Sequence, residues 1–129
     1  MTNVLVTGAN RGLGLGFVKN YLGKNVNVVS TTRDIKNSRE LLALKERFPE
    51  NLEIFELDLL KESSGYTLAN FLGDRPIDIL INNAGIGSTN QHFQAVSPKP
   101  WLEVLTVNLI APLMVTQSII DNVKKSVDK

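Results

Sequence analysis

Three glycines near the N-terminus have the type and spacing that binding chemistry requires. Gly8, Gly12 and Gly14 follow the short apolar run 4–6. Gly8 can turn sharply at a strand end, Gly12 lets backbone amides approach a phosphate group, and Gly14 lets the next helix pack closely against a sheet. The helix N-terminus behind the loop adds unpaired N–H groups and a partial positive charge. The loop therefore predicts a pyrophosphate site.

Another interpretation of this loop stays open, because the same glycines fit a tight strand–helix turn that binds nothing. The loop lacks the Gly-Lys-Ser/Thr that ends a P-loop, which argues against hydrolysis of a nucleoside triphosphate. A further glycine, Gly16, lies inside the expected helix, where glycine costs about 1 kcal/mol relative to alanine. We attribute Gly16 to close packing between this helix and the sheet.

The apolar run 77–81 ends in the sequence Asn-Asn-Ala-Gly, residues 82–85. Small residues such as Ala84 and Gly85 allow close backbone approach, and the amide of Asn83 can tie neighbouring strands together. Two asparagines after an apolar strand are costly unless they are hydrogen-bonded. A plain turn is the alternative interpretation.

Two single polar residues stand beside apolar ones. Asp58 follows the run 52–57, and a strand-end aspartate is a common turn former. Asn108 lies among apolar residues of an expected helix, where a buried amide without a partner costs about 1–3 kcal/mol. Asn108 is therefore expected to be buried and bonded, either in a functional role or in a structural one toward a backbone carbonyl.

These residues lie on elements that alternate regularly along the chain. The expected strands are 4–6, 26–32, 52–57 and 77–81, and the expected helices run from the glycine loop to about 22, over 38–48, over 63–72 and from 98 to about 125. The last helix has Ser97 as N-cap and Pro98 at its first position, and Pro112 is expected to bend it. Such alternation predicts right-handed crossovers and a parallel sheet. The fold class is α/β, a doubly wound sheet of about four strands and four helices that is incomplete.

The end of the second expected strand reads Thr31-Thr32-Arg33, with no acid before Asp34. Dinucleotide folds that select NAD usually place an acid at this position to hold the ribose 2′-hydroxyl. Arg33 can instead pair with a 2′-phosphate, and Arg11 in the glycine loop can close on the same group. This pattern favours NADP over NAD. The alternative is that both arginines are solvated and Asp34 binds the ribose of NAD.

Thr-Gly-x-x-x-Gly-x-Gly at residues 7–14, together with residues 82–85, resembles the short-chain dehydrogenase/reductase family, and the opening Thr-Gly-Ala-Asn-Arg-Gly is similar to carbonyl-reductase-like members. The resemblance implies a Rossmann-type fold and NADP(H)-dependent hydride transfer between the cofactor and a carbonyl or alcohol substrate. It covers residues 1–129 but only the cofactor-binding half of the family's domain. The cofactor contacts that it implies are Gly8, Asn10, Arg11, Gly12, Leu13, Gly14, Thr32, Arg33, Asp58, Leu59, Asn83, Ala84 and Gly85.

The resemblance also implies particular roles. Asp58 would bond the adenine amino group, and Leu59 would supply a backbone contact. Asn108 matches the family's catalytic helix asparagine, which holds a water in a proton relay with a catalytic lysine. The family's Tyr-x-x-x-Lys is absent, because Asn25 and Asn70 stand four residues after the two tyrosines. We therefore expect this chain to carry the cofactor-binding part of an oxidoreductase; the alternative is a catalytically inactive, truncated nucleotide-binding or subunit-pairing module.

The composition excludes several other functions. The 129 residues include no cysteine and one histidine, His92, which excludes disulfides, iron–sulfur clusters and a multi-histidine metal site. His92 is given no role. A formal net charge of +1 offers no basic footprint for nucleic acid. The start of the chain lacks a signal-peptide pattern, and the uncharged stretch 104–120 carries polar residues, so we expect a cytoplasmic protein without a membrane span.

The expected helix 98–125 is apolar around most of its circumference. A helix of this kind is typically buried on more than one side. The strand 77–81 would likewise be an exposed apolar edge, which is an aggregation hazard. We expect a homo-oligomer formed through the helix, as the family resemblance implies, and a small-molecule carbonyl substrate for the parent enzyme.

Overall fold

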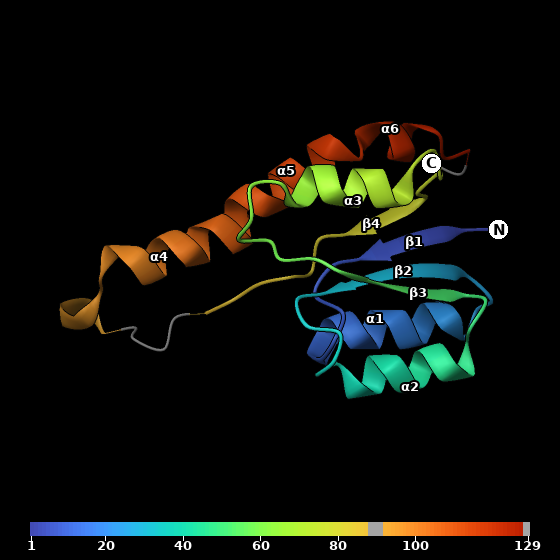
Figure 1. The fold of residues 1–129 in the computed structure, drawn as a ribbon, viewed down its shortest axis with the longest axis horizontal. Coiled ribbons are helices and arrows are strands. Elements are labelled where there is room, and N and C mark those ends of the chain that lie inside the picture. Colours follow the sequence, from blue (N-terminus) through green and yellow to red (C-terminus); the bar gives the residue numbers. More distant parts are fainter. Residues whose placement is uncertain (88–91, 128–129) are drawn as a thin grey trace.

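The computed structural model describes residues 1–87 and 92–127, and within them the chain forms a four-stranded parallel sheet in the order β3-β2-β1-β4. The strands are β1 (Asn3–Val6), β2 (Asn27–Thr32), β3 (Leu52–Glu56) and β4 (Ile79–Ile81). The helices are α1 (Gly12–Leu22), α2 (Arg39–Arg47), α3 (Ser64–Leu72), α4 (Pro98–Leu105), α5 (Ala111–Ser118) and α6 (Ile120–Lys124), with a 3-10 turn at Phe93–Ala95. Helices cover both faces of the sheet (Figure 1), which confirms the predicted α/β fold.

The helices divide the core into two layers (Figure 1). Helices α1 and α2 lie on one face of the sheet, where Leu15, Val18 and Leu41 pack against Val4 and Val6. On the other face lie α3, α5 and α6, and the buried residues there are Leu5, Val29, Leu57, Leu68, Leu72, Ile77, Val115 and Ile119. Because both faces are covered, β1 and β4 are mostly apolar runs. Strand β3 differs, since it contains Glu53 and Glu56.

Strand β1 lies inside the sheet, between β2 and β4. Its residues Val4, Leu5 and Val6 are fully buried. Strand β4 is shorter than the predicted 77–81, because the Ile77 amide donates to the carbonyl of Asn122 at 3.0 Å and so bonds to the C-terminal helix. At the end of the sheet, β4 has only half-buried residues.

The single helix predicted from 98 to about 125 is wrong, because the chain changes helical type along it. A π-helical segment (Thr106–Ile110) joins α4 to α5, and a break at Ile119 separates α5 from α6. The π-helical segment ends two residues before Pro112, whose missing N–H cannot continue the regular hydrogen-bond ladder. Ser97 and Pro98 stand at the predicted N-cap and first positions, although the Ser97 side chain makes no capping hydrogen bond.

Helix α4 extends beyond the sheet (Figure 1), and none of its residues is buried. Among the described residues, no helix combines the length and hydropathy that crossing a bilayer would require.

The prediction that Gly16 packs closely against the sheet is wrong. It is exposed on α1, and a Cβ built on it would have no atom within 4 Å. Gly16 therefore does not mediate close packing between the helix and the sheet, and its position on the outer face of α1 explains the difference.

Candidate functional site

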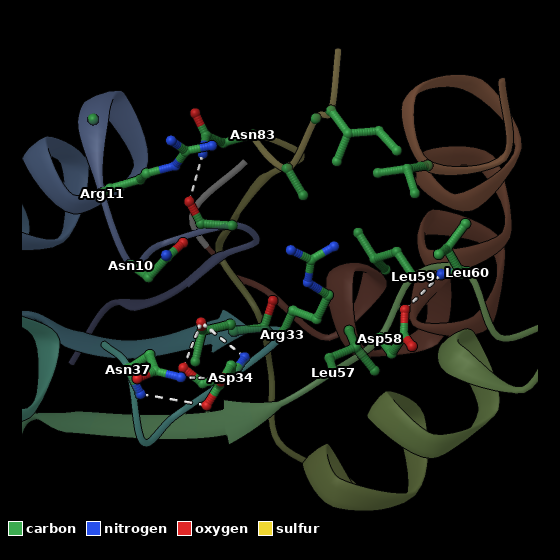
Figure 2. A pocket seen from close by; sticks show the side chains of 18 of the residues that line it. Asn10, Arg11, Arg33, Asp34, Asn37, Leu57, Asp58, Leu59, Leu60 and Asn83 are labelled. Atoms are coloured by element: carbon green, nitrogen blue, oxygen red, sulfur yellow. Dashed lines mark hydrogen bonds between the residues drawn. The ribbon is translucent and has the colours of Figure 1, made fainter. Parts of the chain in front are cut away.

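A cavity of about 740 Å³ opens at the carboxyl ends of the strands. In open α/β sheets this edge is where ligands bind, at the point where the strand order reverses. Four loops line it: the glycine loop, the end of β2, the segment after β3 and the segment after β4 (Figure 2). The predicted residues that line the cavity are Gly8, Asn10, Arg11, Gly12, Leu13, Thr32, Arg33, Asp58, Leu59, Asn83, Ala84 and Gly85.

The glycine loop has the backbone that its sequence predicts. Gly8 and Gly12 have φ values of +63° and +56°, which favour glycine. A Cβ on Gly8 would lie 2.6 Å from the Cα of Ala84, so this loop and the segment after β4 touch through their backbones. At Gly12 a Cβ would meet nothing within 4 Å, so the start of α1 is open toward the cavity.

Gly14 does not line the cavity. It is buried, and a Cβ there would overlap the carbonyl oxygen of Gly8 and the side-chain amide of Asn83. A close approach at Gly14 is therefore confirmed, but its neighbours are the glycine loop and Asn83 in the segment after β4, not the strands of the sheet.

Asn83 ties β4 to β1, as predicted for its amide. Its Nδ2 donates to the carbonyls of Thr7 and Gly8 at 3.0 and 2.9 Å. In return, the buried Thr7 Oγ1 accepts from the backbone amides of Asn83 and Ala84, both at 3.1 Å. Sequence reasoning missed Thr7, although it stands directly before Gly8 in the glycine motif. The four hydrogen bonds fix the floor of the cavity.

Asn82, the first asparagine of the pair, has a different partner. Its Nδ2 donates to Thr116 Oγ1 at 3.0 Å, and this hydroxyl donates to the Pro112 carbonyl at 2.7 Å. Asn82 therefore connects the end of β4 to α5.

Two arginines bring positive charge to one end of the cavity. Arg11 and Arg33 are exposed and line it from the glycine loop and the end of β2. Within residues 1–87 and 92–127, neither side chain makes an ion pair or a hydrogen bond. Figure 2 shows the Arg33 guanidinium pointing into the space between the glycine loop and the segment after β3. Such a donor set fits a phosphate group.

Asp34, the alternative candidate for binding the ribose of NAD, lies beside Arg33, and its carboxylate is hydrogen-bonded within the protein. Its carboxylate accepts from the side chain and the backbone of Asn37 (Figure 2). The side-chain hydrogen bond from Asn37 is the main cause that lowers the pKa of Asp34 below its ordinary value of 3.8. Asn37 also lines the cavity and was not predicted from sequence.

Asp58 forms the turn that one of its two interpretations predicts, and it also lies at the cavity. Its Oδ1 accepts from the Leu60 amide at 3.0 Å, which makes the turn after β3. The same residue lines the cavity next to Leu59 (Figure 2).

Asn108 is exposed, which corrects the prediction that its amide is buried. The side chain lies in the π-helical segment and pairs with the backbone of Ile86: Oδ1 accepts from the Ile86 amide and Nδ2 donates to the Ile86 carbonyl, both at 2.8 Å. Apolar neighbours along the chain suggest burial, but only Val107 is buried, whereas Leu109 and Ile110 are exposed together with Asn108. The structural interpretation, a bond to a backbone carbonyl, describes the contact. Asn108 does not line the cavity, whereas Val107 and Ile86 do.

Comparisons with known proteins place this geometry in context. The family model described as short chain dehydrogenase matches residues 2–128. An NADPH-bound carbonyl reductase from chicken fatty liver is 37% identical and superposes with a TM-score of 0.85, covering 97% of this chain and 52% of that one. A carbonyl reductase from Pseudomonas aeruginosa in complex with NADP is 34% identical with a TM-score of 0.89, covering 95% of this chain and 56% of that one.

Curated relatives are similar over a part of their length. Short-chain dehydrogenase/reductase 1 of Saponaria officinalis is 37% identical over 97 residues, which is 71% of this chain and 32% of the relative. A short chain dehydrogenase of Penicillium aethiopicum is 29% identical over 95% of this chain and 51% of its own length. The chain therefore spans between about a third and about a half of these relatives.

Proposed function

Because this chain belongs to the short chain dehydrogenase family, a family of oxidoreductases, we propose that residues 1–129 bind NADP(H) and form the cofactor-binding half of a carbonyl reductase. The observation that carries the proposal is the pair Arg11 and Arg33, which line the cavity from the glycine loop and from the end of β2. NADP-bound structural relatives support the same cofactor, with NAD as the less favoured alternative.

Each wall of the cavity has a chemical task in this proposal. The open start of α1 at Gly12 and Leu13 offers backbone N–H groups and a partial positive charge to the pyrophosphate. In this proposal Arg33 pairs with the 2′-phosphate, and Asp58 accepts from the adenine amino group. Asn83 and Ala84 hold the backbone against which the nicotinamide ribose packs. When bound, the cofactor supplies the hydride.

The parent enzyme that we propose transfers hydride between NADPH and a small carbonyl or alcohol substrate. The general acid for that reaction lies outside these 129 residues, since no Tyr-x-x-x-Lys occurs in the sequence. The catalytic role that the resemblance implies for Asn108 stays a prediction, as do the substrate and the cytoplasmic location. A nucleotide-binding or subunit-pairing module without catalysis is the second candidate, and it is favoured by the exposed apolar side chains of α4.

Titration of the chain with NADPH, followed by nicotinamide fluorescence, tests the binding proposal. We expect saturable binding and, for Arg33→Ala, an NADPH Kd roughly ten- to a hundredfold higher, the range of a lost charge-assisted hydrogen bond. The Kd for NADH should not change, because NADH lacks the 2′-phosphate. Arg39→Ala is the matched control, since Arg39 is exposed on α2 and does not line the cavity. Absence of saturable NADPH binding at micromolar protein would contradict the proposal.

A further inference from the structure

The turn that follows β2 holds the backbone of Asp34 in place through two buried hydroxyls. The Asp34 amide donates to Thr32 Oγ1 at 3.4 Å, and the Ser38 hydroxyl donates to the Asp34 carbonyl at 2.6 Å. Thr32 Oγ1 lies 2.9 Å from Ser38 Oγ. The Thr32 hydroxyl also donates to the Asp34 carbonyl at 3.5 Å. Thr32 and Ser38 are buried, so the Asp34 backbone is fixed from the interior.

The carboxylate of Asp34 is held separately, from the exposed side, by Asn37. Asn37 Nδ2 donates to Oδ2 at 2.5 Å, and the Asn37 backbone amide donates to Oδ1 at 3.3 Å. Both carboxylate oxygens are therefore engaged by one residue. The lowered pKa of Asp34 agrees with this arrangement, since hydrogen bonds to the ionised form favour it.

The position of this pair matters because both residues line the cavity next to Arg33. Figure 2 shows Asp34 and Asn37 facing each other while Arg33 points into the cavity. A carboxylate that was free to rotate beside Arg33 would neutralise part of its charge, repel a phosphate and accept a hydrogen bond from a ribose hydroxyl.

We propose that Asn37 is a positioning residue for cofactor choice: by holding the Asp34 carboxylate, it keeps that charge away from the subsite of the adenosine 2′-phosphate and so favours NADPH over NADH. This inference rests on the proposed function, since it concerns the same cavity. Asn37 acts through Asp34 and makes no contact with the phosphate in this proposal. Sequence alone presents Asp34 as a candidate ligand of the ribose, and the hydrogen bonds from Asn37 remove it from that role.

The experiment compares the Kd values of NADPH and NADH, each measured by calorimetry, for the unmodified chain and for Asn37→Ala. We expect the preference for NADPH to fall roughly two- to fivefold, the size of an exposed charge interaction. Asn20→Ala is the matched control, because Asn20 is exposed on α1 and does not line the cavity. In an Asp34→Ala background, Asn37→Ala should have no further effect on the ratio, because its action passes through Asp34.

A second readout needs no nucleotide. Carboxyl ¹³C NMR titration of the free protein should show the pKa of Asp34 rising toward 3.8 in Asn37→Ala and staying unchanged in Asn20→Ala. If NADPH binds but the NADPH-to-NADH preference of Asn37→Ala equals that of the unmodified chain, this proposal is overturned while the proposed function stands. If the unmodified chain binds neither nucleotide, the proposed function fails and this proposal fails with it.

Discussion

Gly14 and Gly16 lie two residues apart in α1 and have opposite surroundings. A Cβ on Gly14 would overlap the Gly8 carbonyl and the amide of Asn83, whereas a Cβ on Gly16 would meet nothing within 4 Å. The same residue type therefore serves close packing at one position and merely weakens the helix at the other.

This contrast gives a prediction for two single substitutions. Gly14→Ala should lower the free energy of unfolding by about 1–3 kcal/mol, because the added methyl forces the loop or Asn83 to move. Gly16→Ala should raise it by up to about 1 kcal/mol through improved helix propensity. Urea denaturation followed by circular dichroism measures both. Equal effects of the two substitutions would contradict the packing that the structure assigns to Gly14.

At the residue scale, sequence reasoning succeeds where the deciding interaction is local. The positive φ of Gly8 and Gly12 follows from their place in a short strand–helix turn. Sequence reasoning fails where the partner of a residue is distant in sequence, or where the buried face of a helix has to be identified. Thr7 accepts from amides 76 and 77 residues away, and the exposed face of Gly16 depends on how α1 packs.

At the element scale, the alternation of strands and helices sufficed to predict the sheet, because each apolar run and each amphipathic stretch signals its own element. The long C-terminal helix was predicted as one unit, since helical periodicity does not reveal a π-helical segment. That segment changes which residues of the helix face the sheet, and it turns Asn108 toward Ile86 instead of into the core.

The Asn108–Ile86 contact can be tested by hydrogen exchange. In Asn108→Ala the Ile86 amide loses its only acceptor among the described residues, so its exchange should accelerate roughly tenfold, in keeping with one lost hydrogen bond. Asn70→Ala is the control, because Asn70 is exposed on α3, away from this contact. Unchanged protection of Ile86 would show that the side chain does not hold this segment.

A second element-scale contact joins the start of β1 to the C-terminal end of the chain through Asp78. Its carboxylate accepts from Ser126 Oγ at 2.6 Å and from the Asn3 amide at 2.7 Å. The hydrogen bond from Ser126 is the main cause, and that from Asn3 the second, of a pKa below the ordinary 3.8.

This lowered pKa predicts a pH dependence of stability. A carboxyl whose pKa is lower in the folded state stabilises the fold above its ordinary pKa, and this stabilisation is lost as the pH falls below 3.8 through the folded-state value. Asp78→Ala should therefore lower the free energy of unfolding by about 1 kcal/mol at pH 7. The difference in this free energy from the unmodified chain should shrink as the pH falls below 3.8. Asp121→Ala is the control, since the Asp121 carboxylate forms an exposed ion pair with Lys124. A cost that persists at pH 2 would contradict this assignment.

At the scale of the whole molecule, large apolar side chains are exposed along α4, the π-helical segment that follows it, and α5. Trp101, Leu109 and Leu113 are 53%, 64% and 66% exposed. Surfaces of this kind mark interaction sites when they are contiguous. The predicted homo-oligomer through these helices stays a prediction that the monomer alone does not test.

Sedimentation velocity provides that test. We expect the chain to self-associate at tens of micromolar, and Leu109→Glu combined with Leu113→Glu to shift it to the monomer, because burying two carboxylates is costly. Val127→Glu, at a residue that is 93% exposed outside these helices, is the control. A monomeric unmodified chain at these concentrations would exclude the oligomer.

The bond between Thr7 and Asn83 also has a consequence for how the molecule is made. These partners are 76 residues apart, and closing so long a loop costs more conformational entropy than forming a local contact and slows folding. During synthesis β1 emerges long before β4, so we expect β1 to pair first with β2, which follows it more closely along the chain. The floor of the cavity assembles only when residues 79–83 join the sheet. The cavity in which we propose that the nucleotide binds is thus completed late in folding, and a ligand that binds there would select chains whose folding is complete.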